Sequence, residues 1–263
     1  MKRIYLLGAL ATFTVSCSND DNNGNNNNPS ENYLPLAEGN YWVYDVQGTS
    51  MNGRDSIYFY GDTVINNTTY KKVKSKDPIA TGFFSNALNN NGIRYADGKT
   101  YLSGTAGLSL TEQLPFNLNV TDFIIFDVNA ANNEQLSLTE GNITQEVDGY
   151  TLIFDYKLSS KAKAPIANFT SGNEQYTHVM PVEITLNLKI QVATTFQGFP
   201  ITVTLMEPQN VLVSTQYYAE GIGAVKSSND ISYNLAELPG FELPIPQSGT
   251  EHQEEVLVDY KVE

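Results

Sequence analysis

The sequence predicts a mainly β protein, all-β or β-rich α+β. We expect one large antiparallel sheet, curved or two-layered, with one or two short helices. The main observation is the stretch 182–192, in which apolar and polar residues alternate at every position. Because successive side chains of a strand point to opposite faces, this period marks a strand with one buried and one solvated face. Such one-sided strands belong to antiparallel sheets.

Turn-forming dipeptides that separate β-prone runs are the second observation. Asn tolerates positive φ and Asp-Gly favours a tight turn, so runs that flank these pairs are predicted to form hairpins. The predicted strands are 41–46, 57–65 and 68–75 around Asn66-Asn67, 92–96 and 99–103 around Asp97-Gly98, 150–158 after Asp148-Gly149, 182–192, 201–205, 211–219, 223–226 and 256–262.

Helix is predicted in one main place. Asp77 is a candidate N-cap and Pro78 suits the first helical position, so residues 78–88 are expected to form a helix with one apolar face. A capping-box pattern over 109–112 also favours a helix start, but Pro115 stops it within about one turn.

The N-terminal segment has the three parts of a secretion signal. Two basic residues form a positive flank, residues 4–15 form an apolar run, and a small residue precedes Cys17, the single cysteine of the chain. The run is too short to cross about 30 Å of hydrocarbon, which favours a signal segment over a membrane helix. The pattern resembles the bacterial lipoprotein signal. The resemblance implies that residues 1–16 are removed and that Cys17 carries acyl chains such as palmitate. The alternative is an ordinary secreted protein, cleaved after residues 9–11, with Cys17 a free thiol.

Residues 17–32 are predicted to be a disordered tether. Positions 19–28 contain only Asn, Asp and Gly, which cannot offset the entropy of ordering. The tether would reach about 22 Å as a flexible coil. Ser18 and the acidic pair Asp20-Asp21 resemble the export tag of surface lipoproteins in Bacteroidota, which implies an outer-membrane anchor facing the cell exterior. A plain solvated linker on a periplasm-facing lipoprotein is the alternative.

Composition limits the classes of partner. Removing residues 1–16 leaves 13 Lys and Arg against 29 Asp and Glu, a formal charge of −16. Nucleic acids and anionic lipid surfaces attract basic patches, so the only membrane contact we expect is through lipid at Cys17. Residues 33–263 are long enough to bury one core and are predicted to form a single β-rich domain. That core must supply the stability, because no cysteine follows Cys17.

No stretch carries recognisable catalytic chemistry, and we predict no catalytic residue, cofactor or metal ligand. The two histidines, His178 and His252, have no partners at metal-ligand spacing, and His178 is expected to be half-buried on a strand. Sequence motifs of serine hydrolases, zinc peptidases, phosphate-binding loops and calcium loops are absent. A glycosidase needs only two facing carboxylates. Enzyme activity is therefore left open, with the balance against it.

Aromatic residues allow two interpretations. They cluster at 41–44 and 217–218, and Tyr58 and Tyr60 are expected to share a strand face. An exposed aromatic strip could stack on sugars or line an apolar groove. Packing inside the sheet is favoured, because alternate residues of each strand must face the core.

Two tripeptides, Asp55-Ser56-Ile57 and Asp62-Thr63-Val64, resemble O-glycosylation acceptor sites of Bacteroidota. The resemblance implies modification of Ser56 or Thr63 only where that hydroxyl faces solvent.

Residues 34–44 and 217–226 together resemble the opening and closing motifs of β-rich lipoproteins from Bacteroidota. The resemblance implies a secreted β domain and transfers no catalytic residue. In the second stretch, Gly221 and Gly223 are expected to allow a tight bend between two strands.

Three functions are open at this stage. The first is a lipid-anchored, non-enzymatic binding or structural module with an unknown protein or glycan partner. The second is a carrier or chaperone for an apolar ligand, in which 182–192 lines a concave sheet and 78–88 forms a lid. This second reading resembles lipoprotein carriers in architecture only. The third is a secreted, glycan-directed hydrolase. A filled face over 182–192 would favour the first, an open concavity the second, and two carboxylates in one cleft the third.

Overall fold

A computed structural model describes residues 33–109, 115–196, 198–237 and 246–263. The described chain contains thirteen strands and one α-helix. The elements are β1 (Tyr41–Gly48), β2 (Asn52–Ile65), β3 (Thr68–Ser75), α1 (Phe83–Leu88), β4 (Gly92–Ala96), β5 (Lys99–Ser109), β6 (Pro115–Asp127), β7 (Gln135–Val147), β8 (Tyr150–Ala162), β9 (Ile166–Ser171), β10 (Glu174–Phe196), β11 (Phe199–Ala219), β12 (Gly223–Asn234) and β13 (Ser248–Lys261).

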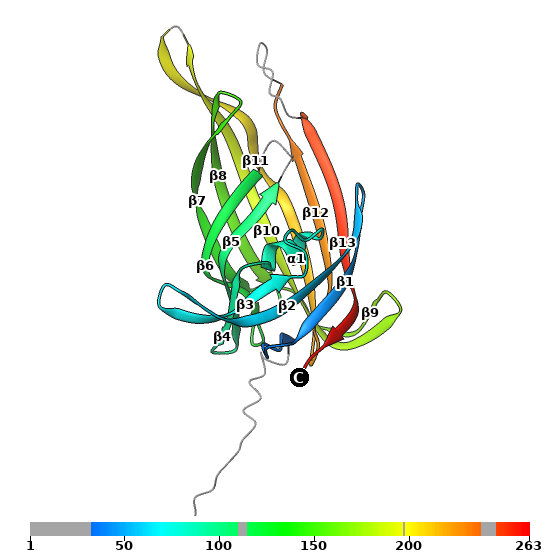
Figure 1. Ribbon diagram of the computed structural model, residues 1–263. Coiled ribbons are helices and arrows are strands. Elements are labelled where there is room, and N and C mark those ends of the chain that lie inside the picture. Colours follow the sequence, from blue (N-terminus) through cyan, green and yellow to red (C-terminus); the bar gives the residue numbers. More distant parts are fainter. Residues whose placement is uncertain (1–32, 110–114, 197, 238–245) are drawn as a thin grey trace, which may run out of the picture.

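All thirteen strands belong to one antiparallel sheet. Its order is β6-β5-β4-β3-β2-β1-β13-β12-β11-β10-β8-β7, and β9 pairs with β10 outside this path. The sheet curves until its two edge strands, β6 and β7, lie side by side, so it is nearly closed into a barrel (Figure 1). The predicted class, a mainly β protein on a large curved antiparallel sheet, is confirmed.

The predicted hairpin turns are confirmed by the backbone. Asn66 and Asn67 have φ of 49° and 65°, and they join β2 to β3. Asp97 and Asp148 also have positive φ, and each precedes a glycine at the turn of its own hairpin. These conformations are ones that Asn, Asp and Gly adopt at low cost, which explains why the local signals were reliable here.

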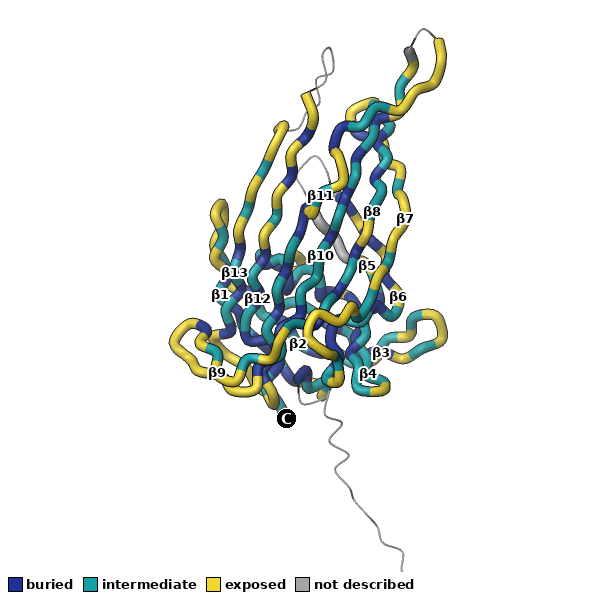
Figure 2. The backbone as a smooth tube through the Cα atoms, turned by 180° about the vertical axis from the view of Figure 1, so that it is seen from behind, coloured by how far each residue is buried: buried dark blue, intermediate teal, exposed yellow. Residues whose placement is uncertain are grey.

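The alternating stretch 182–192 lies in the middle of β10 and turns a buried face inward. Along it, Val182, Leu186 and Leu188 are buried, whereas Ile184 is only half-buried. Figure 2 shows the same alternation of buried and exposed positions along the neighbouring strands. The stretches 201–205 and 211–219, expected as separate strands, form one continuous strand, β11, whose pairing with β10 is interrupted by register shifts. The register shifts lie opposite residues 204–212, between the two predicted stretches, so the strand continues through bulges.

The predicted helix 78–88 is wrong in its start. Helix α1 begins at Phe83, its N-cap position is the extended residue Gly82, and no side chain of its own neighbourhood caps it. Asp77 and Pro78 lie in the bend before it, and Ile79, an apolar residue of the predicted helix, is 80% exposed. The segment starts late because side chains from distant strands bind its backbone N–H groups, as described below. The pattern expected at 109–112 extends beyond the described residues.

The two stretches that resemble lipoprotein motifs contact each other inside the sheet. Trp42 Nε1 donates a hydrogen bond to the carbonyl oxygen of Ile222 at 2.7 Å, and the Tyr44 hydroxyl donates to that of Ala224 at 2.8 Å. The predicted bend is present, with φ of 76° at Gly221 and 120° at Gly223. A Cβ at Gly223 would lie 2.8 Å from Trp42 Nε1, so the indole packs directly on the bend.

We predict that Gly223→Ala destabilises the protein more than Gly221→Ala. Both changes put a side chain at positive φ, which costs about 1–2 kcal/mol. Only Gly223→Ala also pushes a Cβ against Trp42, whereas a Cβ at Gly221 meets no atom within 4 Å. The added overpacking is expected to cost about 1–3 kcal/mol, measured as the free energy of unfolding in urea. Equal losses for the two variants would contradict the packing of Trp42 on the bend.

Candidate functional site

Helix α1 lies against the inner face of the sheet, next to β5, β3 and β2, and shares a small cavity with β10. Phe84 and Leu88 are buried, and they face inward-pointing residues of β5, β6, β8, β10 and β11. The cavity that remains between them has a volume of about 60 Å³. Small-molecule sites usually occupy about 300–1,000 Å³. The face of 182–192 is therefore filled by packing in the described structure.

The start of α1 is held by side chains of two strands. Asp55 of β2 accepts hydrogen bonds from the backbone N–H groups of Thr81 at 2.9 Å and Gly82 at 2.6 Å. Gln253 of β13 accepts one from the N–H of Phe83 at 2.6 Å. The first N–H groups of a helix have no partner within it, so these bonds satisfy donors that would otherwise be buried unpaired.

Glu255 of β13 completes this arrangement, which we call the α1 clasp (Asp55, Gln253 and Glu255). Its carboxylate accepts bonds from the N–H of Phe84 at 2.5 Å, the N–H of Ser85 at 3.0 Å and the Ser85 hydroxyl at 2.6 Å. A Cβ at Gly82 would lie 2.2 Å from the Glu255 carboxyl carbon. The carboxylate is thus enclosed by the turn that it caps, and it has no exposed surface.

Polar side chains continue from the clasp across the inner face of the sheet. Ser227 of β12 pairs across the strands with Glu255, and Gln216 of β11 pairs with Ser227. All three are buried. In the next row, the Nδ2 atom of Asn229 and the hydroxyl of Ser214 have no hydrogen-bond partner among the described residues. The interior beside α1 therefore combines an apolar region with a polar layer.

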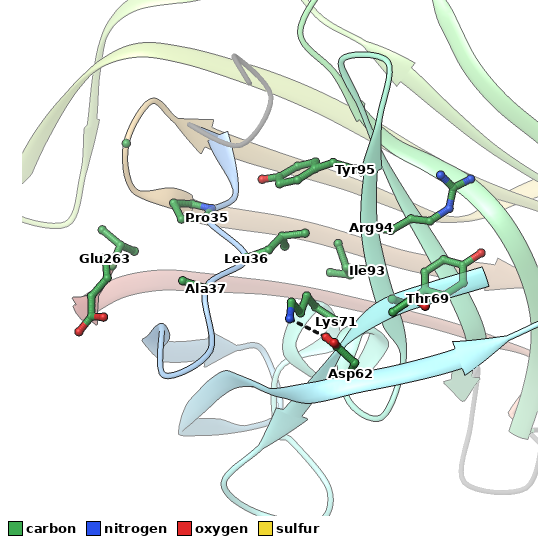
Figure 3. Close-up of a pocket in the computed structure, with 13 residues that line it drawn as sticks. Pro35, Leu36, Ala37, Asp62, Thr69, Lys71, Ile93, Arg94, Tyr95 and Glu263 are labelled. Atoms are coloured by element: carbon green, nitrogen blue, oxygen red, sulfur yellow. Dashed lines mark ion pairs between the residues drawn. The ribbon is translucent and has the colours of Figure 1, made fainter. Parts of the chain in front are cut away.

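A large cleft lies at the end of the sheet where the first and last described residues meet (Figure 3). Its volume is about 680 Å³, in the range of small-molecule sites. We call it the terminal cleft. It is lined by residues 35–37, by β2, β3 and β4, and by the end of the chain at Val262 and Glu263. Apolar side chains such as Leu36 and Ile93 line it beside charged groups.

The charges of the terminal cleft are paired. The Lys71 ammonium lies 2.5 Å from the Asp62 carboxylate, as Figure 3 shows. The Arg94 guanidinium lies 2.9 Å from Asp122 and 4.0 Å from the ring centre of Tyr101. The hydrogen bond from Arg94 holds the pKa of Asp122 below its ordinary value. The Glu263 carboxylate lies 2.5 Å from the Lys261 ammonium. The arrangement suits a ligand with apolar and polar parts, because each charged side chain of the lining already has a partner of opposite charge.

Two further clefts open on the outer surface. One, of about 490 Å³, lies between the outer face of β2 and β3 and residues 89–90; it is lined by Tyr58, Tyr60 and lysines. The other, of about 540 Å³, is lined by residues 170–174 together with Asp45, Glu254 and neighbouring positions of β13. The first is basic and the second acidic, so the two differ in the charge of the ligand they can accept.

The sequence-predicted residues are not brought together in one site. Cys17 and the tether 17–32 lie outside the described residues. His178 is wrong as a half-buried residue: its side chain is 72% exposed, because positive φ at a break in the β10 pairing turns it outward. His252 is also exposed and lies 2.7 Å from Asp230. Within the described part of the chain, no group of three or more acidic, His or Cys side chains could hold a metal ion.

The aromatic residues divide between the two interpretations. Trp42, Tyr44 and Tyr218 are buried, as core packing predicts, whereas Tyr60 is 63% exposed and shares a cleft with Tyr58. Ser56 and Thr63, the candidate acceptor residues, are both half-buried on β2. The acids that precede them are already engaged, since Asp55 belongs to the clasp and Asp62 pairs with Lys71.

Sequence reasoning missed the α1 clasp, because the sequence carries no local signal for it. Residues 254–258 are Glu-Glu-Val-Leu-Val, so polar and apolar residues do not alternate there. The burial of Gln253, Glu255 and Leu257 on one face of β13 is visible only in the structure. A carboxylate on the inward face of a strand is rare unless it is paired, and the partner Phe84 lies 171 positions away in the sequence.

Comparisons with known proteins found no similar protein. No protein-family profile, curated protein or solved structure matches the chain. Within the described residues, no helix has both the length and the apolar character needed to span a membrane.

We predict that the stability of the protein falls as pH rises from about 5 to about 8. Burial raises the pKa of Glu255 from 4.5 to about 7, with a further contribution from Asp55, against the opposing hydrogen bonds of Ser85 and Phe84. Between these values the folded protein binds more protons than the unfolded chain. The contribution of Glu255 is therefore complete at low pH and is lost as pH rises through about 7.

The variant Glu255→Gln tests this linkage. It should flatten the pH dependence of the urea unfolding free energy and lower stability at pH 5 by about 1–3 kcal/mol, because an amide NH₂ would face N–H donors. Glu254→Gln, on the opposite face of β13, is the matched control and should keep the slope of the unaltered protein. An unchanged slope in Glu255→Gln would refute the assignment to Glu255.

Proposed function

We propose that this chain is a lipid-anchored, extracytoplasmic binding module that holds its ligand or partner in the terminal cleft. The observation that supports this proposal is the difference in volume between the interior cavity and the terminal cleft. The interior keeps a cavity of about 60 Å³, whereas the terminal cleft on the outside measures about 680 Å³. A binding function therefore falls to the outer surface.

Two features favour this proposal over the carrier. An apolar cargo would need α1 to leave the interior, which would leave at least five backbone N–H donors of residues 81–85 without their present partners. Each such loss costs about 1–3 kcal/mol. The interior also carries the polar layer of Gln216, Ser227 and Glu255, which apolar cargo would have to cover.

The hypothesis of a hydrolase is not supported by Asp55 and Glu255, the two carboxylates that lie close together. Asp55 and Glu255 are near enough for the charge of one to raise the pKa of the other. Both are buried, and every oxygen of the pair accepts a hydrogen bond from residues 81–85. A glycosidase needs its carboxylates on either side of a bound sugar, open to substrate.

The anchoring part of the proposal rests on the sequence signal around Cys17. The described chain begins at residue 33, and its last residue, Glu263, donates a backbone hydrogen bond to Asn40 at 3.0 Å. The terminal cleft therefore lies at the end of the domain where the described chain begins (Figure 1). A ligand held there would sit between the domain and the membrane surface. We place the protein at the outer membrane, exposed on the cell surface or facing the periplasm.

Replacing Cys17 by Ala should release the protein from the membrane fraction into the soluble fraction. Several acyl chains hold a protein stably, at about 0.8 kcal/mol per buried CH₂, and the variant has none. Fractionation and immunoblotting measure the distribution, with Ser18→Ala as the matched control that should stay bound. A Cys17→Ala protein that stays in the membrane fraction would contradict the lipid anchor.

The variant Thr69→Trp should abolish binding in the terminal cleft. Thr69 is an exposed residue of β3 that lines the cleft, so an indole there fills the space without removing an interior contact. Thr144→Trp, at an exposed position on β7, is the matched control. The measurement is mass spectrometry of the lipids and proteins that co-purify with the acylated full chain. The cleft assignment fails if both variants retain the same ligand, or if the unaltered protein retains none.

A further inference from the structure

The outer face of β2 and β3 carries a basic groove on an acidic protein. Four of the chain's 15 Lys and Arg residues fall within residues 71–76, although the formal net charge of the chain is −14. Lys71 faces the terminal cleft, where Asp62 neutralises it. Lys74 and Lys76 line the groove of about 490 Å³ with Tyr58 and Tyr60. We call this space the tyrosine–lysine groove.

A β-bulge turns Tyr60 outward. In the pairing of β2 with β3, Phe59 is opposite Val73 and Asp62 is opposite Lys71, so Tyr60 and Gly61 together face the single residue between. Gly61 has a φ of 61°, which bends the strand at this point. Tyr60 is 63% exposed as a result, and Tyr58 lies two residues away on the same face.

The polar groups of the groove are hydrogen-bond donors with positive charge. The described lining contains Lys74 and Lys76 but no carboxylate, and neither lysine forms an ion pair with any residue in the described part of the chain. Lys74 Nζ donates to Asn90 Oδ1 at 2.5 Å, a neutral acceptor that leaves its charge uncompensated. The Nδ2 atom of Asn90 has no acceptor among the described residues, so it adds a further donor.

We propose that the tyrosine–lysine groove binds an anionic oligosaccharide. The flat apolar faces of Tyr58 and Tyr60 match the C–H faces of sugar rings, while Lys74 and Lys76 match carboxylate or sulfate groups on them. The cleft beside β9 offers such a ligand no free cation, because its one lysine, Lys226, is paired with Glu254.

A nucleic acid offers rings and anions too, but its charge density is unsuited to this surface. DNA carries one negative charge per about 1.7 Å of duplex. A strand that extends past the groove would therefore bring many negative charges close to a protein whose own formal net charge is −14. The proposal goes beyond the proposed function, since the groove is a second surface, distinct from the terminal cleft.

The test is calorimetric titration of the full chain in detergent with four probes: oligogalacturonate, dextran sulfate, neutral dextran and a thymidine oligonucleotide. We expect binding of oligogalacturonate, dextran sulfate or both, and binding of neutral dextran at least about ten-fold weaker. The two acidic probes distinguish a carboxylate from a sulfate ligand. Binding of neither, or tighter binding of the oligonucleotide, would overturn the proposal.

Variants separate a built site from ion exchange. Lys74→Gln with Lys76→Gln should weaken binding of the acidic sugar about ten-fold or more, and Tyr60→Ala about five-fold. The matched controls are Lys157→Gln, an exposed lysine of β8, and Tyr260→Ala, an exposed tyrosine of β13. Both controls should stay within about two-fold. If Tyr60→Ala binds the acidic sugar with the same affinity as the unaltered protein, binding is non-specific charge attraction and the proposal is refuted. This conclusion does not depend on the outcome for Thr69→Trp.

Discussion

The structure depends on one constraint: a helix that begins inside a sheet must find partners for its first N–H groups. Water cannot serve them there, and each unpaired donor costs about 1–3 kcal/mol. The sheet supplies the partners from β2 and β13, as Asp55, Gln253 and Glu255. This clasp fixes α1, and α1 in turn fills the interior with Phe84 and Leu88. The filled interior then leaves binding to the outer surface.

The clasp is also the point at which two opposing electrostatic effects meet. The N-terminal end of α1 and three donated hydrogen bonds favour a charged Glu255, whereas complete burial and the neighbouring Asp55 disfavour it. Burial prevails, which leaves the carboxyl close to half-protonated near neutral pH. A protonated carboxyl can still accept both backbone bonds, so the clasp tolerates this state and even gains stability from it. Holding a helix here therefore does not require a permanent buried charge.

Local signals in the sequence predicted the parts of the fold that local chemistry decides. The turns at Asn66-Asn67 and Asp97-Gly98 depend on their own φ preferences, and both are present. The start of α1 depends instead on residues about 170 positions away, so the local signal at Asp77 was misleading. For the site, Tyr58 and Tyr60 could be placed on one face by alternation. The different exposure of the two, Tyr58 half-buried and Tyr60 63% exposed, could not be predicted, because the bulge beside Tyr60 is defined only by the pairing with β3.

The β2–β3 pair serves two outer surfaces of different electrostatic character. On one side, Lys71 meets Asp62 and the terminal cleft has its charges paired. On the other side, Lys74 and Lys76 meet only neutral groups, so the groove keeps its positive charge. The bulge at Tyr60 and Gly61 lies between these faces and shifts the register that separates them. A straight pairing of the same residues, without the bulge, would place Asp62 opposite Tyr70 and no longer opposite Lys71, so both surfaces depend on the same irregularity.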